Sequence, residues 1–321
     1  MTSTNFEFVP YTSAFLSELT ATRAGETKLG EKLQVGLNST AKFVLIGVQE
    51  DIGPQANLGK PGATNAFPAF LSRFVNMQSN RFLSGDIIAI GGFVKQTTFF
   101  STVEEGKLLV DELDNMLIQL LTPLYQNNQI PILIGGGHNN AYALIAAYNK
   151  AKAKSLEVIN LDPHADCRRL EGRHSGNSFS YAQENGFLTT YSVLGLHKAY
   201  NGENMLSYLD EQQFFYSFFE EYLLAPEKLT VDLLDVLEKN DEVLGVELDL
   251  DCMKNMPSSA FTPSGLEVEQ ARKYLTKIAR SGRQVAYVHL PEGAPITSDD
   301  EKIVGKTLAY LVHDFIANYS I

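Results

Sequence analysis

The sequence predicts one large α/β domain in three layers (α-β-α), with helices on both faces of a mainly parallel central sheet. Three observations support this prediction. Apolar runs of strand length recur along the chain, helical stretches separate them, and the 321 residues are 44% apolar, enough for a sizeable core. Strands that are apolar throughout are buried on both faces, which is typical of parallel sheets covered by helices.

The predicted strands are the short apolar runs. They lie at residues 43–47, 86–92, 130–137, 155–162, 190–196, 242–250 and 284–290. Between and after them, apolar residues recur at three- and four-residue spacing, which predicts helices at 107–128, 139–152 and 301–319. Ligands bind beyond the carboxyl ends of the strands in such sheets. Residues with chemistry should therefore gather where the strands end.

The domain organisation follows from composition. Residues 1–40 are polar and mixed, and we predict that they form a helical N-terminal extension packed on the domain. Residues 41–321 contain no repeat, low-complexity tract or proline-rich linker, which predicts a single domain. The first fifteen residues lack the order of a secretory signal, and no apolar run approaches the roughly 20 residues that span a bilayer. A cytoplasmic protein is the simplest interpretation.

Charge and cysteine content exclude several classes of protein. The formal net charge of -12 argues against a nucleic-acid partner and against an anionic membrane surface. Only two cysteines occur, Cys167 and Cys252, so no disulfide framework is expected. Each directly follows an aspartate of the motifs described next, and we interpret both as small buried packing residues rather than as a redox control.

Three predicted strands end in residue types that bind metal ions. One strand ends at His138, the second runs into Asp162-Pro163-His164-Ala165-Asp166, and the third runs into Asp249-Leu250-Asp251. Alternate side chains of an extended chain share a face, so the members of each motif should converge on one point. Any one motif alone could be an ordinary loop, but three matched strand ends in one chain favour a metal site.

The charge of this cluster favours two ions. Four crowded carboxylates would repel one another and raise one another's pKa values unless cations neutralised them. Oxygen-rich ligation with two imidazoles and no thiolate favours a hard ion such as Mn²⁺ over structural zinc. Two ions about 3.5–4 Å apart can share a water and lower its pKa toward neutrality. The cluster therefore predicts hydrolytic chemistry with two Mn²⁺ per chain.

Several motifs together resemble the ureohydrolase superfamily, which comprises arginase, agmatinase and formiminoglutamase. The resemblance covers roughly residues 40–315 and rests on GVQEDIGPQANLGKPGA, GGGHNN, NLDPHADCR, HSGNSF and ELDLDCM. It implies an arginase-like fold, a binuclear manganese centre, and hydroxide attack on an amidine or guanidine carbon that expels an amine. It also implies a possible homo-oligomer, because the family commonly forms trimers or hexamers.

The resemblance implies a role for each of the six ligands. One histidine and one aspartate would serve each ion: His138 with Asp166, and His164 with Asp251. Asp162 and Asp249 would bridge the two ions. Asp166 would also orient the bridging hydroxide and help to pass a proton to the leaving amine.

Two departures from the arginase branch point to the formiminoglutamase-like branch. Gly137 stands where arginases have an aspartate, and Phe179 takes the place of their proton-shuttling histidine. His174 is the candidate to replace that shuttle, although a loop histidine bonded to a backbone carbonyl is an equally good interpretation. At the end of the last core strand, His289 stands where the family usually has a glutamate, with Glu292 three residues later. Either side chain could face the reacting carbon.

Substrate contacts are expected in the loop after the D-x-H-x-D motif. Arg168 could bind a substrate carboxylate through two hydrogen bonds, or could form only a surface salt bridge. By similarity, Ser175 and Asn177 would bind substrate, and the alternative is that they only form a turn.

Three functional hypotheses remain open from the sequence. The first is a manganese-dependent hydrolase that splits N-formimino-L-glutamate into glutamate and formamide. The second keeps this mechanism but takes a guanidino substrate, such as arginine or agmatine, and releases urea. The third is a metal-binding scaffold that has lost catalysis, which the intact ligand set argues against.

Overall fold

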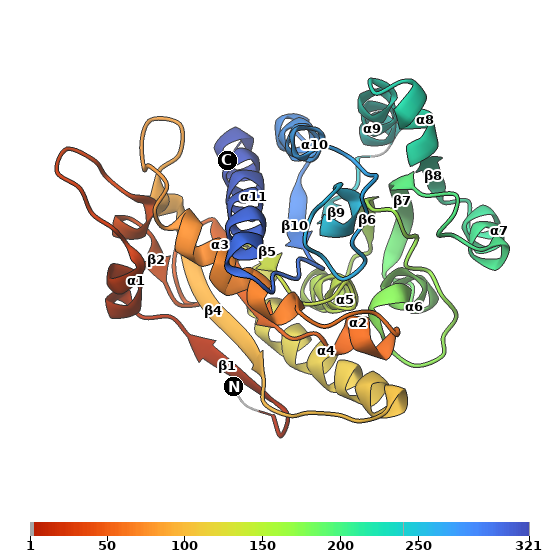
Figure 1. Ribbon diagram of the computed structural model, residues 1–321, viewed down its shortest axis with the longest axis horizontal. Coiled ribbons are helices and arrows are strands. Elements are labelled where there is room, and N and C mark those ends of the chain that lie inside the picture. The colour runs from red at the N-terminus through yellow and green to blue at the C-terminus, as the bar shows by residue number, and fades with distance from the viewer. Residues whose placement is uncertain (1–2, 240, 321) are drawn as a thin grey trace.

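A computed structural model describes residues 3–239 and 241–320 (Figure 1). Its ten strands form one sheet. Their bounds are β1 (Phe6–Pro10), β2 (Gln34–Val35), β3 (Phe43–Gln49), β4 (Ile88–Gln96), β5 (Ile130–Ile134), β6 (Leu156–Leu161), β7 (Leu188–Leu196), β8 (Phe215–Phe218), β9 (Leu244–Leu248) and β10 (Val285–Leu290). The strand order is β1-β4-β3-β5-β10-β9-β6-β7-β8, and β2 pairs with β4 beside this path.

The sheet is parallel except at one edge, where β1 runs antiparallel to β4. Every residue of the central strands β5, β10, β9 and β6 is buried. This agrees with their largely apolar sequences, because a strand covered on both faces has no solvent-facing side. The prediction of a mainly parallel sheet is confirmed.

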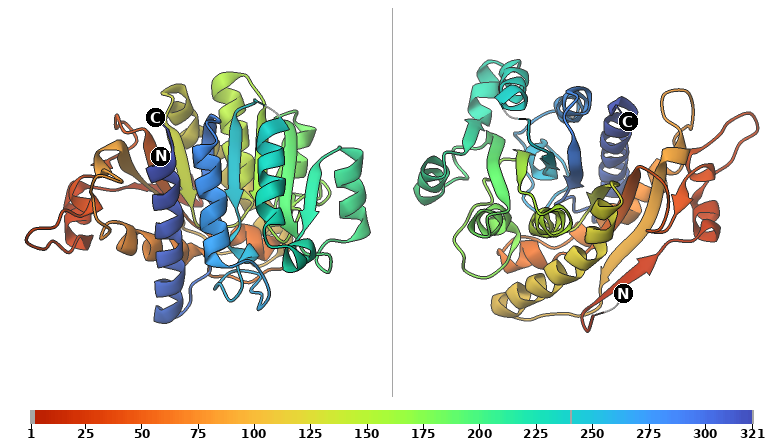
Figure 2. Two further views of the ribbon diagram at one scale, coloured as in Figure 1. Left: turned by 90° about the horizontal axis from the view of Figure 1, so that it is seen from above. Right: turned by 180° about the vertical axis from the view of Figure 1, so that it is seen from behind.

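Helices cover both faces of the sheet. One face carries α3 (Ala66–Phe74), α9 (Lys228–Lys239), α10 (Val268–Arg280) and α11 (Ser298–Asn318). The left view of Figure 2 shows α10 and α11, in blue, running alongside the strands. The other face carries α4 (Val103–Gln126), α5 (Asn140–Lys152) and α6 (Ser178–Glu184). Short helices complete the fold: α1 (Ser13–Leu19), α2 (Ile52–Ala56), α7 (Glu203–Glu211) and α8 (Phe219–Leu224). Two apolar cores, one on each face, confirm the three-layer prediction.

The N-terminal segment is less helical than expected. Residues 6–10 form the edge strand β1, residues 34–35 form β2, and among the described residues 3–40 only α1 is an α-helix. The polar, mixed composition hid these strands, because an edge strand needs only one buried face and β1 buries Phe6 alone. The expectation of a helical extension is therefore wrong in detail, whereas the division into residues 1–40 and 41–321 stays a prediction.

The topology brings the predicted motifs to one edge of the sheet. Strands β5, β10, β9 and β6 are neighbours in that order and all run in the same direction, so the loops that follow them meet. Those four loops contain every predicted metal ligand and Glu292. Within the residues that the structure describes, none of the helices has both the length and the apolar character needed to cross a membrane.

Candidate metal centre

His138 lies at the centre of a ring of carboxylates. Its Nδ1 is 3.1 Å from Oδ2 of Asp162, 3.0 Å from Oδ2 of Asp166 and 3.0 Å from Oδ2 of Asp249. These four donor atoms all lie within 4.8 Å of one another. Three strand ends, far apart in sequence, thus bring four donor atoms, two of them from the loop after β6, around a space that suits a single cation.

A second group of donors lies beside the first. His164 Nδ1 is 3.6 Å from Oδ1 of Asp162 and 4.0 Å from Oδ2 of Asp251. Asp162 therefore turns one carboxylate oxygen toward each histidine. That orientation suits a carboxylate that bridges two ions, and the structure brings all six predicted ligands together.

The backbone reaches this arrangement by turns rather than by an extended chain. Asp166 has φ +49°, a left-handed conformation that is uncommon for residues other than glycine. Asp249 caps the 3₁₀ turn Leu250–Cys252, and its Oδ1 accepts the Asp251 N–H at 2.7 Å. Asp162 Oδ1 accepts the His164 N–H at 2.7 Å in the same way. The side-chain alternation argued from sequence is thus wrong as a mechanism, although the residues do converge.

The electrostatics of the cluster call for added positive charge. Burial and the neighbouring carboxylates Asp251 and Asp162 raise the pKa of Asp249 well above its usual value. Burial and Asp162 likewise raise the pKa of Asp166. Burial disfavours the charged form of His138, yet the surrounding carboxylates raise its pKa well above the usual value. In the metal-free protein a protonated histidine thus partly supplies the charge that a divalent cation would bring, so the donor set fits divalent metal ions.

A cavity of about 280 Å³ opens onto these donors. Its lining includes Asn57, His164, Asp166, Arg168, Ser175, Tyr200, Asp249, Asp251, Ser259 and Glu292. This size is near the lower end of what small-molecule sites occupy. Its floor is acidic, and its rim carries one arginine.

Glu292 faces this cavity, and His289 is not among the residues that line it. One oxygen of Glu292, Oε1, accepts the backbone N–H of His138 at 2.7 Å, while Oε2 is buried without a hydrogen-bond partner. Burial and nearby Asp251 raise the pKa of Glu292 to about 8. Its φ of +67° is again left-handed, which marks a backbone position held by its surroundings.

The rim of the cavity holds Arg168. Its guanidinium donates to Asn57 Oδ1 at 2.9 Å and pairs with Glu171 at 2.9 Å, and about half of the side chain is exposed. Ser175 also lines the cavity and accepts a hydrogen bond from the Asn57 amide at 3.3 Å. Asn57 therefore ties together two residues that the sequence singled out.

His174 and Asn177 lie outside the lining of this cavity. Nδ1 of His174 accepts the Gly176 N–H at 3.1 Å, and its Nε2 is 3.3 Å from a Glu171 oxygen. Burial lowers the pKa of His174 to about 4. Asn177 accepts from Arg173 at 2.6 Å, which anchors the loop. Both ring nitrogens of His174 are thus engaged, and its shuttle role stays a prediction, as does substrate binding by Asn177.

The two departures from the arginase branch have structural counterparts. A Cβ on Gly137 would lie 2.3 Å from Cδ of Pro54, so no larger residue fits there while Pro54 keeps its place. The ring of Phe179 stacks on Tyr191 at 4.2 Å between centroids and meets His138 edge-on at 5.4 Å. Phe179 thus packs against the predicted ligand His138 instead of lining the cavity.

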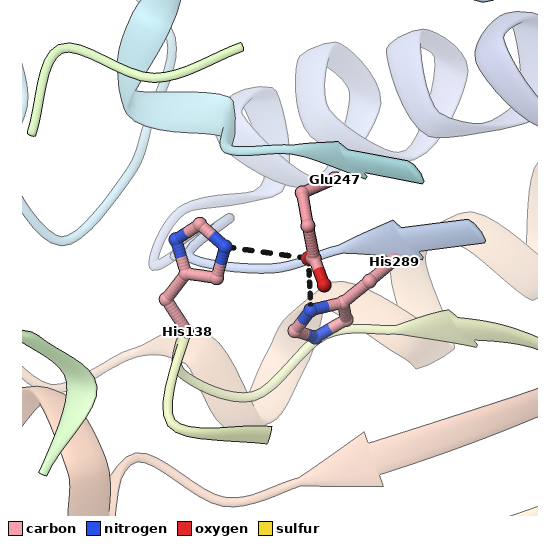
Figure 3. A group of neighbouring side chains, drawn as sticks. All are labelled: His138, Glu247 and His289. Carbon is pink, nitrogen blue, oxygen red and sulfur yellow. Dashed lines mark hydrogen bonds and ion pairs between the residues drawn. The ribbon is translucent and has the colours of Figure 1, made fainter. Parts of the chain in front are cut away.

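Sequence reasoning missed a buried glutamate beneath the ligands. Glu247 Oε2 lies 3.3 Å from Nε2 of His138 and 2.7 Å from Nδ1 of His289 (Figure 3). The signal was present, since Glu247 is the one charged residue of the apolar strand β9 and stands two positions before Asp249. Tyr200 was also missed. Its ring stacks on that of His164 at 5.5 Å between centroids.

Both cysteines are free and buried, as expected. Burial raises the pKa of the Cys167 and Cys252 thiols well above the usual value. A buried thiol that stays protonated is a poor nucleophile and a poor metal ligand.

Comparison with known proteins decides the family. The sequence matches the Arginase family over residues 41–317. The chain belongs to the arginase family. This confirms the resemblance inferred from the motifs and makes the protein an arginase-family hydrolase whose buried histidine and carboxylate clusters could hold metal ions.

Relatives of this arginase-family chain include formimidoylglutamases. The protein of Staphylococcus carnosus (strain TM300) is 25% identical over 299 residues, which cover 91% of this chain and 88% of that protein. Formiminoglutamase of Trypanosoma cruzi with Mn²⁺ superposes with a TM-score of 0.73 at 20% identity, covering 92% of this chain and 100% of that one. Formimidoylglutamase from Bacillus subtilis superposes with a TM-score of 0.74 at 16% identity, covering 92% of this chain and 94% of that one. At these identities the solved structures support the arginase-like fold.

Proposed function

We propose that this protein is a binuclear manganese hydrolase of a linear amidine C–N bond, with N-formimino-L-glutamate as its substrate and glutamate and formamide as products. The observation that carries the proposal is the cavity, with a free carboxylate oxygen of Glu292 beside the ligand cluster and Arg168 at the rim. The similarity to formimidoylglutamases supports the choice of substrate.

The six clustered side chains would hold the two ions. His138 and Asp166 would hold one ion, His164 and Asp251 would hold the other, and Asp162 and Asp249 would be shared between the two. Mn²⁺ suits this oxygen-rich donor set, and the Trypanosoma cruzi relative was solved with Mn²⁺. When bound, such a pair of ions lowers the pKa of a water so that it can attack at neutral pH.

Protein groups would orient the substrate. An amidinium is a planar cation, and Glu292, which lines the cavity and leaves Oε2 without a hydrogen-bond partner, would accept a charge-assisted hydrogen bond from it. Arg168, held by Asn57 and half exposed, would take a substrate carboxylate at the rim. Asp166 lines the cavity next to the reacting position, where it would accept a proton and pass it to the departing amine.

An assay of the purified, manganese-loaded protein tests this function. We expect formamide release from N-formimino-L-glutamate and no urea release from arginine, agmatine or related guanidines. Urea release without formamide release would overturn the proposed substrate but keep the hydrolytic mechanism. If every compound is left intact while two Mn²⁺ are bound, the catalytic proposal itself is wrong.

Two variants test the substrate contacts. Glu292→Gln should lower kcat/KM about 10- to 100-fold, because a charge-assisted hydrogen bond contributes about 1.5–3 kcal/mol. Arg168→Ala should raise KM with little change in kcat, and Arg168→Lys should restore only part of the affinity, since lysine lacks the two-pronged geometry. An unchanged KM in Arg168→Ala would contradict the assigned carboxylate contact.

A further inference from the structure

A row of three buried polar side chains crosses the middle of the sheet one layer below the ligands. Asn160 on β6, Glu247 on β9 and His289 on β10 are cross-strand neighbours, because Asn160 pairs with Glu247 and Glu247 pairs with His289. All three are 0% exposed. Cross-strand neighbours in register share a face of the sheet. The ligands Asp162 and Asp249 follow two residues after members of this row.

The row touches the ligands directly. Asn160 donates to Asp162 Oδ2 at 2.9 Å. Glu247 Oε2 lies 3.3 Å from His138 Nε2, on the side of the ring away from the carboxylates at Nδ1. The same oxygen is 2.7 Å from His289 Nδ1 (Figure 3). Two imidazole rings thus converge on one carboxylate oxygen.

We infer that Glu247 and His289 form a positioning pair that fixes His138 for metal binding. A histidine whose Nε2–H donates to a carboxylate keeps its Nδ1 lone pair free, and Nδ1 is the atom that faces Asp162, Asp166 and Asp249. Carboxylate–histidine–metal arrangements of this kind orient the ring and raise its basicity. The inference rests on the proposed metal centre at His138.

His289 acts on the metal site only through Glu247. It is fully buried, it does not line the cavity, and its Nδ1–H donates to Glu247. This bond holds the Glu247 carboxylate in the rotamer that reaches His138. It also gives a structural role to the histidine that stands where the family usually has a glutamate, while Glu292 occupies the cavity.

One competing use of these side chains is a third metal ion. Glu247, His289 and His138 Nε2 offer donor atoms within 4.8 Å of one another. The geometry favours hydrogen bonding, because Oε2 and His289 Nδ1 are already 2.7 Å apart and all three residues are completely buried. An ion there would also require His138 to bind metal through both ring nitrogens. Metal stoichiometry separates the two interpretations, since a third ion would overturn the positioning pair.

Manganese binding by the full chain tests the inference without reference to turnover. Titration of metal-free wild type should show two Mn²⁺ per chain. Glu247→Gln and His289→Leu should each weaken one of the two sites about 10- to 100-fold, the usual effect of losing such a partner. Glu157→Gln is the matched control: Glu157 is also 0% exposed and lies on β6, but it pairs with Arg283. It should lower thermal stability and leave both Mn²⁺ affinities unchanged.

The double variant tests the order of the contacts. Because His289 works through Glu247, Glu247→Gln combined with His289→Leu should bind Mn²⁺ no more weakly than the worse single variant. His289→Gln keeps a donor and should recover most of the affinity. Unchanged affinities in both single variants, or losses that multiply in the double variant, would overturn the inference. A wild type that binds fewer than two ions would instead refute the proposed centre.

Discussion

The two ends of the central strands handle buried negative charge in opposite ways. At the amino end, Glu157 on β6 is fully buried and pairs with Arg283 at 2.8 Å. At the carboxyl end, the four clustered aspartates have only histidines as ion-pair partners among the described residues. One end is neutralised by the chain itself, whereas the other leaves room for cations from solution.

This difference separates structural charge from functional charge. The charge of a carboxylate paired with a guanidinium is balanced within the folded chain, so it does not require a bound cation. Carboxylates that raise one another's pKa values store unfavourable energy that a divalent ion releases on binding. The same sheet can therefore be stabilised at one end and prepared for a metal at the other.

The largest expected effect is on metal binding at the carboxyl end. Asp249→Asn should weaken Mn²⁺ binding by more than about 100-fold and abolish hydrolysis, because a direct ligand matters more than the outer partners that contribute 10- to 100-fold. It should not destabilise the metal-free protein, since burial and the neighbouring Asp251 and Asp162 already disfavour the ionised form of Asp249. Metal titration and thermal unfolding measure the two effects. A metal-free variant that unfolds at a clearly lower temperature than wild type would contradict the charge argument.

A substitution at the amino end should show the reverse. Arg283→Met leaves Glu157 buried without its partner, which should cost about 3–5 kcal/mol of unfolding free energy. Mn²⁺ affinity should stay unchanged. Denaturant unfolding and metal titration test both statements, with Lys302→Met as the control, because its ion pair with Asp299 is largely exposed. Equal losses in the two variants would show that burial of Glu157 does not matter.

The pH dependence of stability should depend on bound metal. Burial and Asp251 raise the pKa of Glu292 from 4.5 to about 8. The stability that protonated Glu292 contributes to the folded protein is therefore complete below pH 4.5 and is lost as pH rises through about 8. Burial opposes protonation of His164, but Asp162 raises the pKa of this ring from 6.5 to about 10. Deprotonation of His164 at rising pH therefore also lowers the stability of the folded protein. The metal-free protein should therefore lose stability between about pH 6 and pH 9.

Bound Mn²⁺ should counter this trend. Ligands must lose protons to bind metal, so Mn²⁺ affinity rises with pH and the metal-induced increase in melting temperature should grow over the same range. Thermal unfolding measured with and without Mn²⁺ at about pH 6 and about pH 9 provides the test. If the melting temperature of the metal-free protein rises toward alkaline pH, the prediction is wrong.

The smallest expected effect is at the cavity wall. Tyr200→Leu removes the ring that stacks on His164. Such aromatic contacts contribute about 0.5–1.5 kcal/mol, so Mn²⁺ affinity should fall about two- to tenfold. Tyr310→Leu, which removes an α11 tyrosine that packs against Arg272 of α10, should leave metal binding unchanged. A loss in Tyr200→Leu as large as that in Asp249→Asn would mean that Tyr200 does more than pack against His164.

The sequence alone determined the layers of the fold and the positions of the metal-ligand candidates. Largely apolar strands of this kind are buried between two layers of helices, and ligand-binding residues gather where such strands end. That reasoning located His138 and the two aspartate motifs. It failed for β1, because a partly exposed edge strand carries no continuous apolar signal.

Only the tertiary structure decided which side chains meet. Sequence could not choose between His289 and Glu292, because a left-handed turn at Glu292 aims it into the cavity while strand pairing directs His289 to Glu247. It could not show that Asp166 reaches His138 through a left-handed backbone, or that Arg168 is held by Asn57. Residue types and spacing record which chemistry is possible. Contacts between strands that are far apart in sequence are set by packing, and packing is a property of the whole chain.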